Sequence, residues 1–366
     1  MNNPLPWFGR LSLGLLLFAG VLMQSACTQN SGEPPSGVAS SGNVLRPGHL
    51  GRTIGDLPTI VHFYHDLLGA GFIGDPDAPV SFFATQPLID FVTSPPESEF
   101  RSVNMPIPGT SVAPGDVPEM VVEAIEFRNI DRHQYLPDMQ DPGVSNLTLL
   151  VRDLDKTVAT LKEAGVIFVT EGGEPVDVSP VPGLTGTARA VIVRDPDGYP
   201  VELMQLTPTP ETNAPAGSNI IGAHIARVVA DLDTTMDFYR HVIGSDLQTW
   251  ESPDFQLDEA ENRLRDTPGA EERLGTMLLP GSGVLMELIQ YRNIESTPYH
   301  PKIQDIGVGH VAFMVKDMDL VLERLDAEGV KTLGREPGAY QLNPKTRAIY
   351  TTDPDGFFLE VMERQE

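Results

Sequence analysis

The chain has 366 residues, of which 40% are hydrophobic and 21% are charged. That composition is typical of a globular protein, and the length allows two domains with their own cores. Acidic residues outnumber basic ones by 51 to 25, which gives a formal net charge of -26. Such a charge repels nucleic acid phosphates and anionic lipid head groups, so we expect neither as a direct partner.

The first residues of the chain have the layout of a secretory signal. Arg10 is the only charged side chain before Cys27, and residues 11–23 form an apolar stretch. A stretch of that length is too short to cross a bilayer comfortably but suits the apolar core of a signal peptide. We therefore predict a signal peptide over residues 1–26 and an exported protein.

Cys27 is the only cysteine, and it directly follows Ser25 and Ala26. This arrangement resembles a bacterial lipoprotein signal, in which the cysteine is lipidated and becomes the mature N-terminus. The resemblance implies lipidation at Cys27 and a lipid anchor in a bacterial membrane, facing the periplasm, with simple cleavage as the alternative. Residues 27–47 are rich in Gly, Ser, Pro and Asn, which predicts a flexible tether.

An internal repeat is the most informative feature, because repeats decide the architecture. Short motifs of the first half return in the same order in the second half. The matched pairs are FRNI at 127–130 with YRNI at 291–294, QDPGV at 140–144 with QDIGV at 304–308, DPDG at 195–198 and 353–356, HxxR at 49–52 and 224–227, and FY at 63–64 and 238–239. Residues 209–218 read as a linker between domains at 48–208 and 219–366.

Each half divides again into two segments with a shared pattern. A short apolar run is followed by Asp and by an amphipathic helix that ends near Gly. The Asp residues are Asp56, Asp153, Asp231 and Asp317, and the Gly residues are Gly69, Gly165, Gly244 and Gly329. We expect each Asp to cap its helix and each Gly to end it. Apolar runs typical of strands follow each helix. The predicted fold class is α+β, with four β-α-β-β-β modules paired into two domains.

These paired modules resemble the vicinal oxygen chelate superfamily. The phrases DLDxxxxFY at 231–239 and DPDGxxxE at 353–360 carry the same resemblance, which covers about residues 48–366. The superfamily includes glyoxalase I, extradiol dioxygenases and the bleomycin-resistance proteins. Because one such fold hosts many chemistries, the resemblance predicts the fold more firmly than the reaction.

The resemblance also implies a set of metal ligands, which in this family come from the first and last strands of each module. In the second half these positions hold His224, Glu287, His310 and Glu360. Two imidazoles and two carboxylates suit a divalent zinc, nickel, iron, manganese or cobalt ion.

The first half holds His49, Glu123, Asn146 and Glu202 at the equivalent positions. An amide oxygen is a poor ligand for these metals, so Asn146 predicts that the first-half site is degenerate.

A metal ion in the second-half site would chelate neighbouring oxygens of a small substrate. The resemblance to glyoxalase I implies proton transfer through an enediolate by a metal-dependent lyase or isomerase, with Glu287 or Glu360 as the catalytic base. Two alternatives stay open. One is an Fe(II) extradiol-type ring-cleaving dioxygenase, which needs only two His and one Glu. The other is a non-catalytic protein that binds or sequesters a small molecule.

Overall fold

The computed structural model describes residues 42–111, 120–180, 186–244, 248–279, 282–298 and 300–365, which belong to one compact unit. The predicted signal peptide, Cys27 and most of the predicted tether lie outside the described residues. The end of the tether does not, because the first strand begins at Val44, so residues 44–47 are strand rather than tether. Within the described ranges, no helix is long and apolar enough to cross a membrane.

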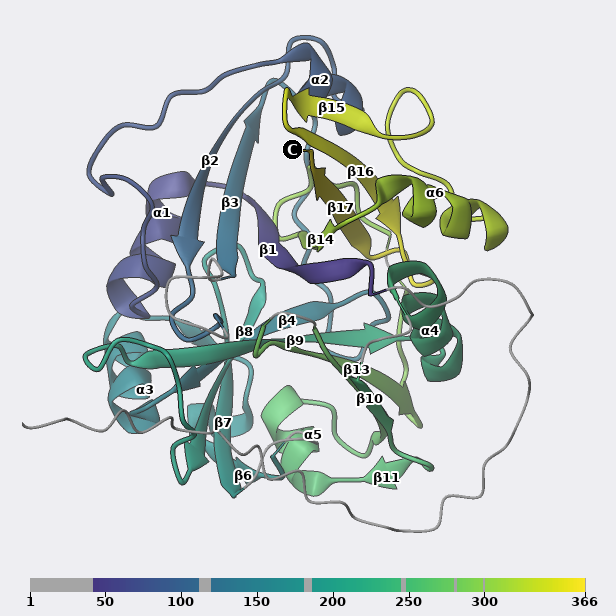
Figure 1. Cartoon of the computed structure of the whole chain (residues 1–366). Helices are drawn as coiled ribbons and strands as arrows, with labels where there is room; N and C mark the ends of the chain where they lie inside the picture. The colour runs from purple at the N-terminus through teal and green to yellow at the C-terminus, as the bar shows by residue number, and fades with distance from the viewer. Residues whose placement is uncertain are drawn as a thin grey trace, which may run out of the picture. The chain divides into compact units, whose positions relative to one another are not determined.

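Two sheets make up the fold, and Figure 1 shows that the purple N-terminal strand lies beside the yellow C-terminal strands in one of them. This first sheet has seven strands in the order β15-β16-β17-β14-β1-β3-β2. Its strands are β1 (Val44–Ile54), β2 (Glu99–Pro106), β3 (Val121–Arg128), β14 (Gly309–Val315), β15 (Tyr340–Asn343), β16 (Thr346–Thr352) and β17 (Phe358–Arg364).

The second sheet has ten strands in the order β10-β12-β13-β9-β4-β8-β7-β5, with β11 beside β12 and β6 beside β7. Its strands are β4 (Ser145–Val151), β5 (Ile167–Phe168), β6 (Val176–Val178), β7 (Thr187–Arg194), β8 (Pro200–Thr207), β9 (Ile220–Val229), β10 (Gln248–Glu251), β11 (Gln256–Leu257), β12 (Glu271–Leu278) and β13 (Leu285–Arg292).

One helix follows the first strand of each module, as predicted. These helices are α1 (Leu57–Val61) continued by η1 (His62–Leu67), α3 (Leu154–Glu163), α4 (Leu232–Phe238) continued by η3 (Tyr239–Ile243), and α6 (Met318–Ala327). The carboxylates of the four predicted Asp caps accept backbone N–H groups three residues later, which confirms the caps. The four predicted Gly residues have positive φ angles at the helix ends. Helices α2 (Gln86–Phe91), η2 (Glu171–Gly173) and α5 (Glu259–Arg265) lie outside the repeat.

The α+β class and the four-module repeat are confirmed, but the modules do not pair in chain order. β1 of module one lies antiparallel to β14 of module four, and β4 of module two lies antiparallel to β9 of module three. Each half of the chain therefore gives one module to each sheet. The repeat could not reveal this, because all four first strands carry the same pattern and each offers a free edge to any other.

Two buried arginine–aspartate pairs join the sheets. Arg52 on β1 donates to Asp195, in the first DPDG turn, at 2.9 Å, and the Tyr64 hydroxyl donates to the same carboxylate at 3.0 Å. Arg227 on β9 and Asp353 in the second DPDG turn repeat this pair. Both pairs are fully buried, and breaking such a pair costs about 3–5 kcal/mol. The repeated HxxR, FY and DPDG motifs therefore hold the two sheets together.

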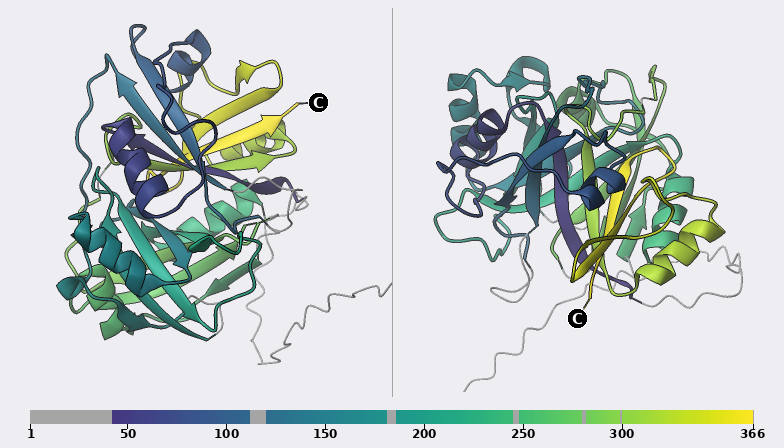
Figure 2. Two further views of the ribbon diagram at one scale, coloured as in Figure 1. Left: turned by 90° about the vertical axis from the view of Figure 1, so that its left-hand side faces the viewer. Right: turned by 90° about the horizontal axis from the view of Figure 1, so that it is seen from above.

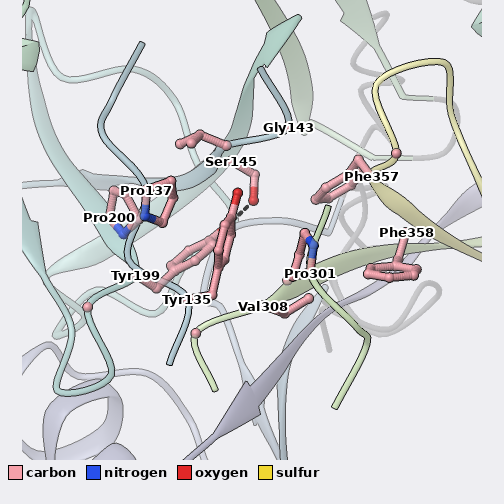
Figure 3. Close-up of a pocket in the computed structure, with 15 residues that line it drawn as sticks. Tyr135, Pro137, Gly143, Ser145, Tyr199, Pro200, Pro301, Val308, Phe357 and Phe358 are labelled. Atoms are coloured by element: carbon pink, nitrogen blue, oxygen red, sulfur yellow. Dashed lines mark hydrogen bonds between the residues drawn. The ribbon is translucent and has the colours of Figure 1, made fainter. Parts of the chain in front are cut away.

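The rings that cover these arginines line a small cavity (Figure 3). Arg52 lies over the ring of Tyr199 and Arg227 over that of Phe357. The cavity has a volume of about 20 Å³, and Ser145 and Tyr199 share a hydrogen bond of 3.1 Å at its edge. A space of that size holds about one water molecule, so it is no substrate site.

Candidate metal centre

Four potential metal ligands converge on the first sheet, one from each of four neighbouring strands. They are His49 on β1, Glu123 on β3, His310 on β14 and Glu360 on β17, and we call them the metal cluster. Their ligand atoms all lie within 4.8 Å of one another. The register places Gly51 of β1 opposite both His310 and Glu123, so these side chains project from one face of the sheet.

His49 lies at the centre of the metal cluster. Its Nε2 is 2.9 Å from Oε2 of Glu360, 3.2 Å from Oε2 of Glu123 and 3.1 Å from Nε2 of His310. The Nε2 of His310 is 3.4 Å from the same oxygen of Glu360. Ligands that bind one metal ion at about 2 Å lie about 3 Å from one another, so the spacing of this cluster fits a small cation.

Gly51 makes room for one of these ligands. A Cβ atom at this position would lie 1.8 Å from Cε1 and 2.2 Å from Nε2 of the His310 ring. No side chain can approach another this closely, so any residue larger than glycine displaces the imidazole.

The charges within the metal cluster attract a cation. Burial opposes a charge on His49, but Glu123 and Glu360 outweigh it and raise the pKa of His49 to about 9. Burial also opposes the charge on Glu360, but its hydrogen bonds to His310 and His49 lower the pKa of Glu360 to about 2. A divalent ion that binds here replaces the proton that His49 otherwise holds.

Tyr350 on β16 fixes the two most buried ligands. Its hydroxyl donates to Oε2 of Glu360 at 3.3 Å and lies 3.1 Å from Nε2 of His310. Its ring stacks on Phe91 of α2, with the ring centroids 4.4 Å apart. Figure 2 shows α2, in blue, beside the yellow strands of module four. A helix inserted in module one therefore supports a ligand-holding side chain of module four.

An apolar pocket with a volume of about 280 Å³ opens beside the metal cluster. His49, Glu123, Glu360 and Tyr350 lie at one side of it. The apolar lining includes Phe83, Leu88, Phe100, Ile125, Phe127 and Met362. Among the described residues, no lysine or arginine lines it. The pocket therefore suits an uncharged apolar group that is attached to metal-binding oxygens.

The second sheet has four equivalent positions, but different residues occupy them. They hold His224 on β9, Glu287 on β13, Asn146 on β4 and Glu202 on β8. Ala226 takes the place that Gly51 has in the first sheet, because it lies opposite both Asn146 and Glu287. A methyl group therefore stands where the first sheet leaves room for an imidazole.

The guanidinium of Arg265, at the end of α5, lies between the carboxylates of this second set. Its Nη2 is 3.7 Å from Glu202 and 3.5 Å from Glu287, and its Nη1 donates to Asn146 at 3.5 Å. All four side chains are buried. A fixed side-chain cation thus takes the position of a metal ion. Burial outweighs the attraction of Arg265 and raises the pKa of Glu287 to about 7.

No hydrogen bond or ion pair joins His224 to this arginine-centred group among the described residues. The residue is 3% exposed, and its Nδ1 has no hydrogen-bond partner within the described part of the chain. The neighbouring apolar cluster includes Leu264 and Leu285, the residue opposite His224. Burial lowers the pKa of His224 to about 4, so the ring is a neutral core histidine.

The predicted ligand set is therefore corrected. His310 and Glu360 lie in the metal cluster, but His224 and Glu287 lie in the other sheet because the modules cross between the halves. Their places are taken by His49 and Glu123. The sequence identified these two as equivalent positions but assigned them to a degenerate site because of Asn146, which lies in the second sheet. One difference in the sequence could have indicated the correct site. Glycine stands two residues after His49, whereas alanine stands two residues after His224.

A family model described as the Glyoxalase/Bleomycin resistance protein/Dioxygenase superfamily matches residues 46–203 and 222–361. The chain belongs to this superfamily. The superfamily fold is present twice, and the metal cluster takes His49 and Glu123 from the first matched segment and His310 and Glu360 from the second.

Two curated relatives are enzymes of known reaction class by name. A 2-epi-5-epi-valiolone epimerase from Actinomyces sp is 32% identical over 153 residues, which are 40% of this chain and 82% of the relative. A probable chloroplastic lactoylglutathione lyase from Arabidopsis thaliana is 24% identical over 209 residues, which are 57% of this chain. The chain covers less than half of that lyase, 47% of its length.

Solved structures of the superfamily share the fold over most of the chain. A glyoxalase I variant from Zea mays has a TM-score of 0.54 at 17% identity, over 87% of this chain and 93% of that one. A structure from Bacillus subtilis that is described as a candidate dioxygenase has a TM-score of 0.54 at 12% identity, over 89% and 87%. At such identities the likeness extends to the fold alone.

Proposed function

We propose that this superfamily member is a metal-dependent enzyme that moves a proton on a small substrate with two neighbouring oxygens, as a lyase or an isomerase does. The observation that carries the proposal is the convergence of His49, Glu123, His310 and Glu360 on one point. This donor set suits zinc, nickel, iron, manganese or cobalt. A divalent ion held there supplies Lewis acidity, which stabilises negative charge on the substrate oxygens.

Glu123 is the side chain to which we assign the role of base. It is 22% exposed and lines the apolar pocket, whereas the side chain of Glu360 is 6% exposed and is held by Tyr350. A base has to reach the carbon-bound proton of the substrate, whereas a structural ligand has to stay fixed. The role predicted for Glu287 therefore passes to Glu123, and Glu360 is proposed as a ligand.

The pocket beside the metal cluster favours a substrate with an apolar part. Aromatic and aliphatic side chains line it, and no lysine or arginine among the described lining residues is available to pair with a carboxylate or phosphate. Two relatives are named an epimerase and a lyase, which are the reaction classes proposed here.

The second candidate function is an Fe(II) ring-cleaving dioxygenase, which the aromatic lining of the pocket also fits. That reaction needs two His and one carboxylate, which His49, His310 and Glu360 supply. Glu123 would then have no role in metal binding. The position of Glu123 beside His49, at 3.2 Å, favours the four-residue site.

A matched pair of variants tests the proposal. Purified metal-loaded protein is incubated in deuterium oxide with 2-hydroxyacetophenone, an apolar α-hydroxycarbonyl probe, and exchange at the hydroxyl-bearing carbon is measured. Glu123→Gln is expected to keep the metal and to lower exchange by about 10²–10⁴-fold, the usual contribution of a general base. Glu287→Gln, the equivalent change in the second sheet, should leave exchange unchanged.

Three outcomes separate the functions. Loss of exchange in Glu123→Gln alone supports the proton-transfer enzyme. Oxygen uptake with catechol that persists in Glu123→Gln supports the dioxygenase instead. A metal-loaded parent protein with neither activity but with tight binding of the probe is a binding protein, and the proposal is then wrong.

We further propose that the protein is exported and anchored by a lipid on Cys27, facing the periplasm. The apolar residues 11–23 followed by Ser-Ala-Cys support this. Cells expressing the full chain are labelled with a radioactive fatty acid. The parent protein is expected to incorporate the label and Cys27→Ser is not. A parent protein without label contradicts the lipid anchor.

A further inference from the structure

The second sheet contains a cavity of its own beside Arg265. Its volume is about 270 Å³, and its lining residues come from β8, β10, β11, α5, β12, β13 and connecting segments. Pockets for drug-sized ligands measure about 300–1,000 Å³, so this cavity suits a smaller molecule. We call it the second-sheet cavity.

More carboxyl groups than cationic side chains line the second-sheet cavity. Its only described cation is Arg265, and its carboxylates are Glu202, Asp258, Glu261, Glu272 and Glu287. Arg265 pairs with Glu202 and Glu287, and its Nε lies 3.4 Å from Glu261. Asp258 is also engaged, because it caps α5 by accepting two backbone N–H groups. Four of the five carboxylates therefore form ion pairs or hydrogen bonds within the protein.

Glu272 is the carboxylate that remains. It is 8% exposed, lines the second-sheet cavity and makes no hydrogen bond or ion pair with any described residue. The residue opposite it on β13 is Tyr291, whose buried hydroxyl also lacks a partner among the described residues. Burial raises the pKa of Glu272 to about 6. The charge of Arg265 favours the ionised form, but this guanidinium is shared with Glu202, Glu261 and Glu287. A ligand cation would stabilise the ionised Glu272 carboxylate further.

Part of the lining is apolar. It includes Met204, Leu274 and Trp250, and Trp250 is 44% exposed. An indole face attracts cations, and it also packs against apolar groups. A divalent metal ion finds neither soft ligands nor an unpaired ligand set here, and Arg265 repels it.

We propose that the second-sheet cavity binds a small primary amine, whose ammonium group meets Glu272 and whose apolar part packs on Trp250. The ammonium supplies three donors, and the Glu272 carboxylate, which lines the cavity, accepts from it. This inference does not depend on the proposed function, because the amine contacts none of the residues of the metal cluster.

Tryptophan fluorescence can report directly on ligand binding in the second-sheet cavity. The chain contains two, Trp7 and Trp250. In the full chain carrying Trp7→Phe, tryptophan fluorescence therefore reports on the second-sheet cavity alone. Benzylamine is titrated as the probe, and benzyl alcohol serves as the matched neutral compound. We expect a saturable fluorescence change with benzylamine and at least about tenfold weaker binding of benzyl alcohol.

Three variants of that chain locate the interaction. Glu272→Gln should weaken benzylamine binding at least about tenfold, which is a loss of about 1.4 kcal/mol. Glu259→Gln, an exposed change on helix α5, which also carries Glu261 and Arg265 of the cavity, should leave it unchanged. His310→Ala should also leave it unchanged, which separates this site from the metal cluster.

Several results would overturn the proposal. These are equal binding of the amine and the alcohol, equal binding by Glu272→Gln, or competition of benzylamine with manganese chloride. The comparison of the two probes needs only the Trp7→Phe chain. It therefore decides the question even if Glu272→Gln fails to fold.

Discussion

The two sheets arrange the same strand positions around a centre, but different residues occupy these positions in the two sheets. In the first sheet, Gly51 leaves room for His310, and the metal cluster faces an apolar pocket. In the second sheet, Ala226 stands beside Asn146, and the Arg265 guanidinium lies between two carboxylates. A metal ion has vacant positions for substrate oxygens, whereas an arginine has none. Arg265 thus places a single positive charge between the carboxylates of the second centre and supplies no Lewis acidity.

The largest expected difference between the two centres is in metal binding. His49→Ala or His310→Ala removes an imidazole from the metal cluster, so we expect metal affinity to fall by more than about 100-fold, since even outer-shell changes cost 10–100-fold. His224→Ala is the matched control and should keep the metal. Metal analysis after dialysis measures all three. Loss of metal in His224→Ala with retention in His49→Ala would reverse the assignment of the two centres.

We expect Arg265 to affect the free energy of unfolding and not the metal affinity. Arg265→Ala leaves Glu202 and Glu287 as buried carboxylates without their cation, which should lower the free energy of unfolding by about 3–5 kcal/mol. Arg263→Ala on the same helix removes an exposed pair with Glu171 and should lower it by less than about 1 kcal/mol. Urea denaturation of both variants, with metal content held constant, measures the difference. Equal stability of the two would show that Arg265 does not balance the second centre.

Gly51 and Ala226 occupy equivalent positions in the two sheets, so exchanging glycine and alanine at each position tests both centres. Gly51→Ala places a methyl group against the His310 ring, so we expect metal affinity to fall by up to about 100-fold, as for other changes that misplace a ligand. Ala226→Gly should leave metal affinity unchanged and reduce stability by only about 0.5–1 kcal/mol. Metal titration followed by a competing chelator gives both affinities. Undiminished affinity in Gly51→Ala would mean that the His310 ring does not need that space.

The smallest predicted effect concerns the pH dependence of stability. The pKa of His224 is about 4 in the folded chain and about 6.5 when unfolded, so the unfolded state gains a proton first as the pH falls. The stabilisation that depends on neutral His224 is fully present above about pH 6.5. Between about pH 7 and pH 5, protonation of His224 in the unfolded chain lowers the free energy of unfolding by about 2 kcal/mol. Glu287, with its raised pKa, acts in the opposite direction, because its contribution is lost as the pH rises through about 7.

Comparison with His224→Leu isolates this contribution. Thermal or urea unfolding of the parent and the variant is followed over the same pH range. The difference in free energy of unfolding should change by about 2 kcal/mol towards acid pH. A constant difference would show that His224 is not a neutral core residue.

The sequence predicted those parts of the fold that depend on contacts close along the chain. The Asp56 cap and the end of its helix at Gly69 need only neighbouring residues, and the repeat reveals them in all four modules. The pairing of modules depends on which strand edges meet in space. No local pattern encodes that, because β1, β4, β9 and β14 are alike in sequence.

The candidate site was predictable to the same degree. His310 and Glu360 belong to one module, so their motif positions place them together. Their partners His49 and Glu123 depended on the crossing of modules. Arg265 was not predictable, because α5 lies outside the repeat and a helical Arg four residues after Glu261 is typical of an exposed ion pair.

The most direct test of the central claim is the position of the metal itself. Crystals of the zinc-loaded protein are measured at the zinc absorption edge, and the anomalous difference map is calculated. The account predicts a single peak per chain, bounded by His49, Glu123, His310 and Glu360. A peak between Glu202 and Glu287, or one bonded to His224, would contradict it.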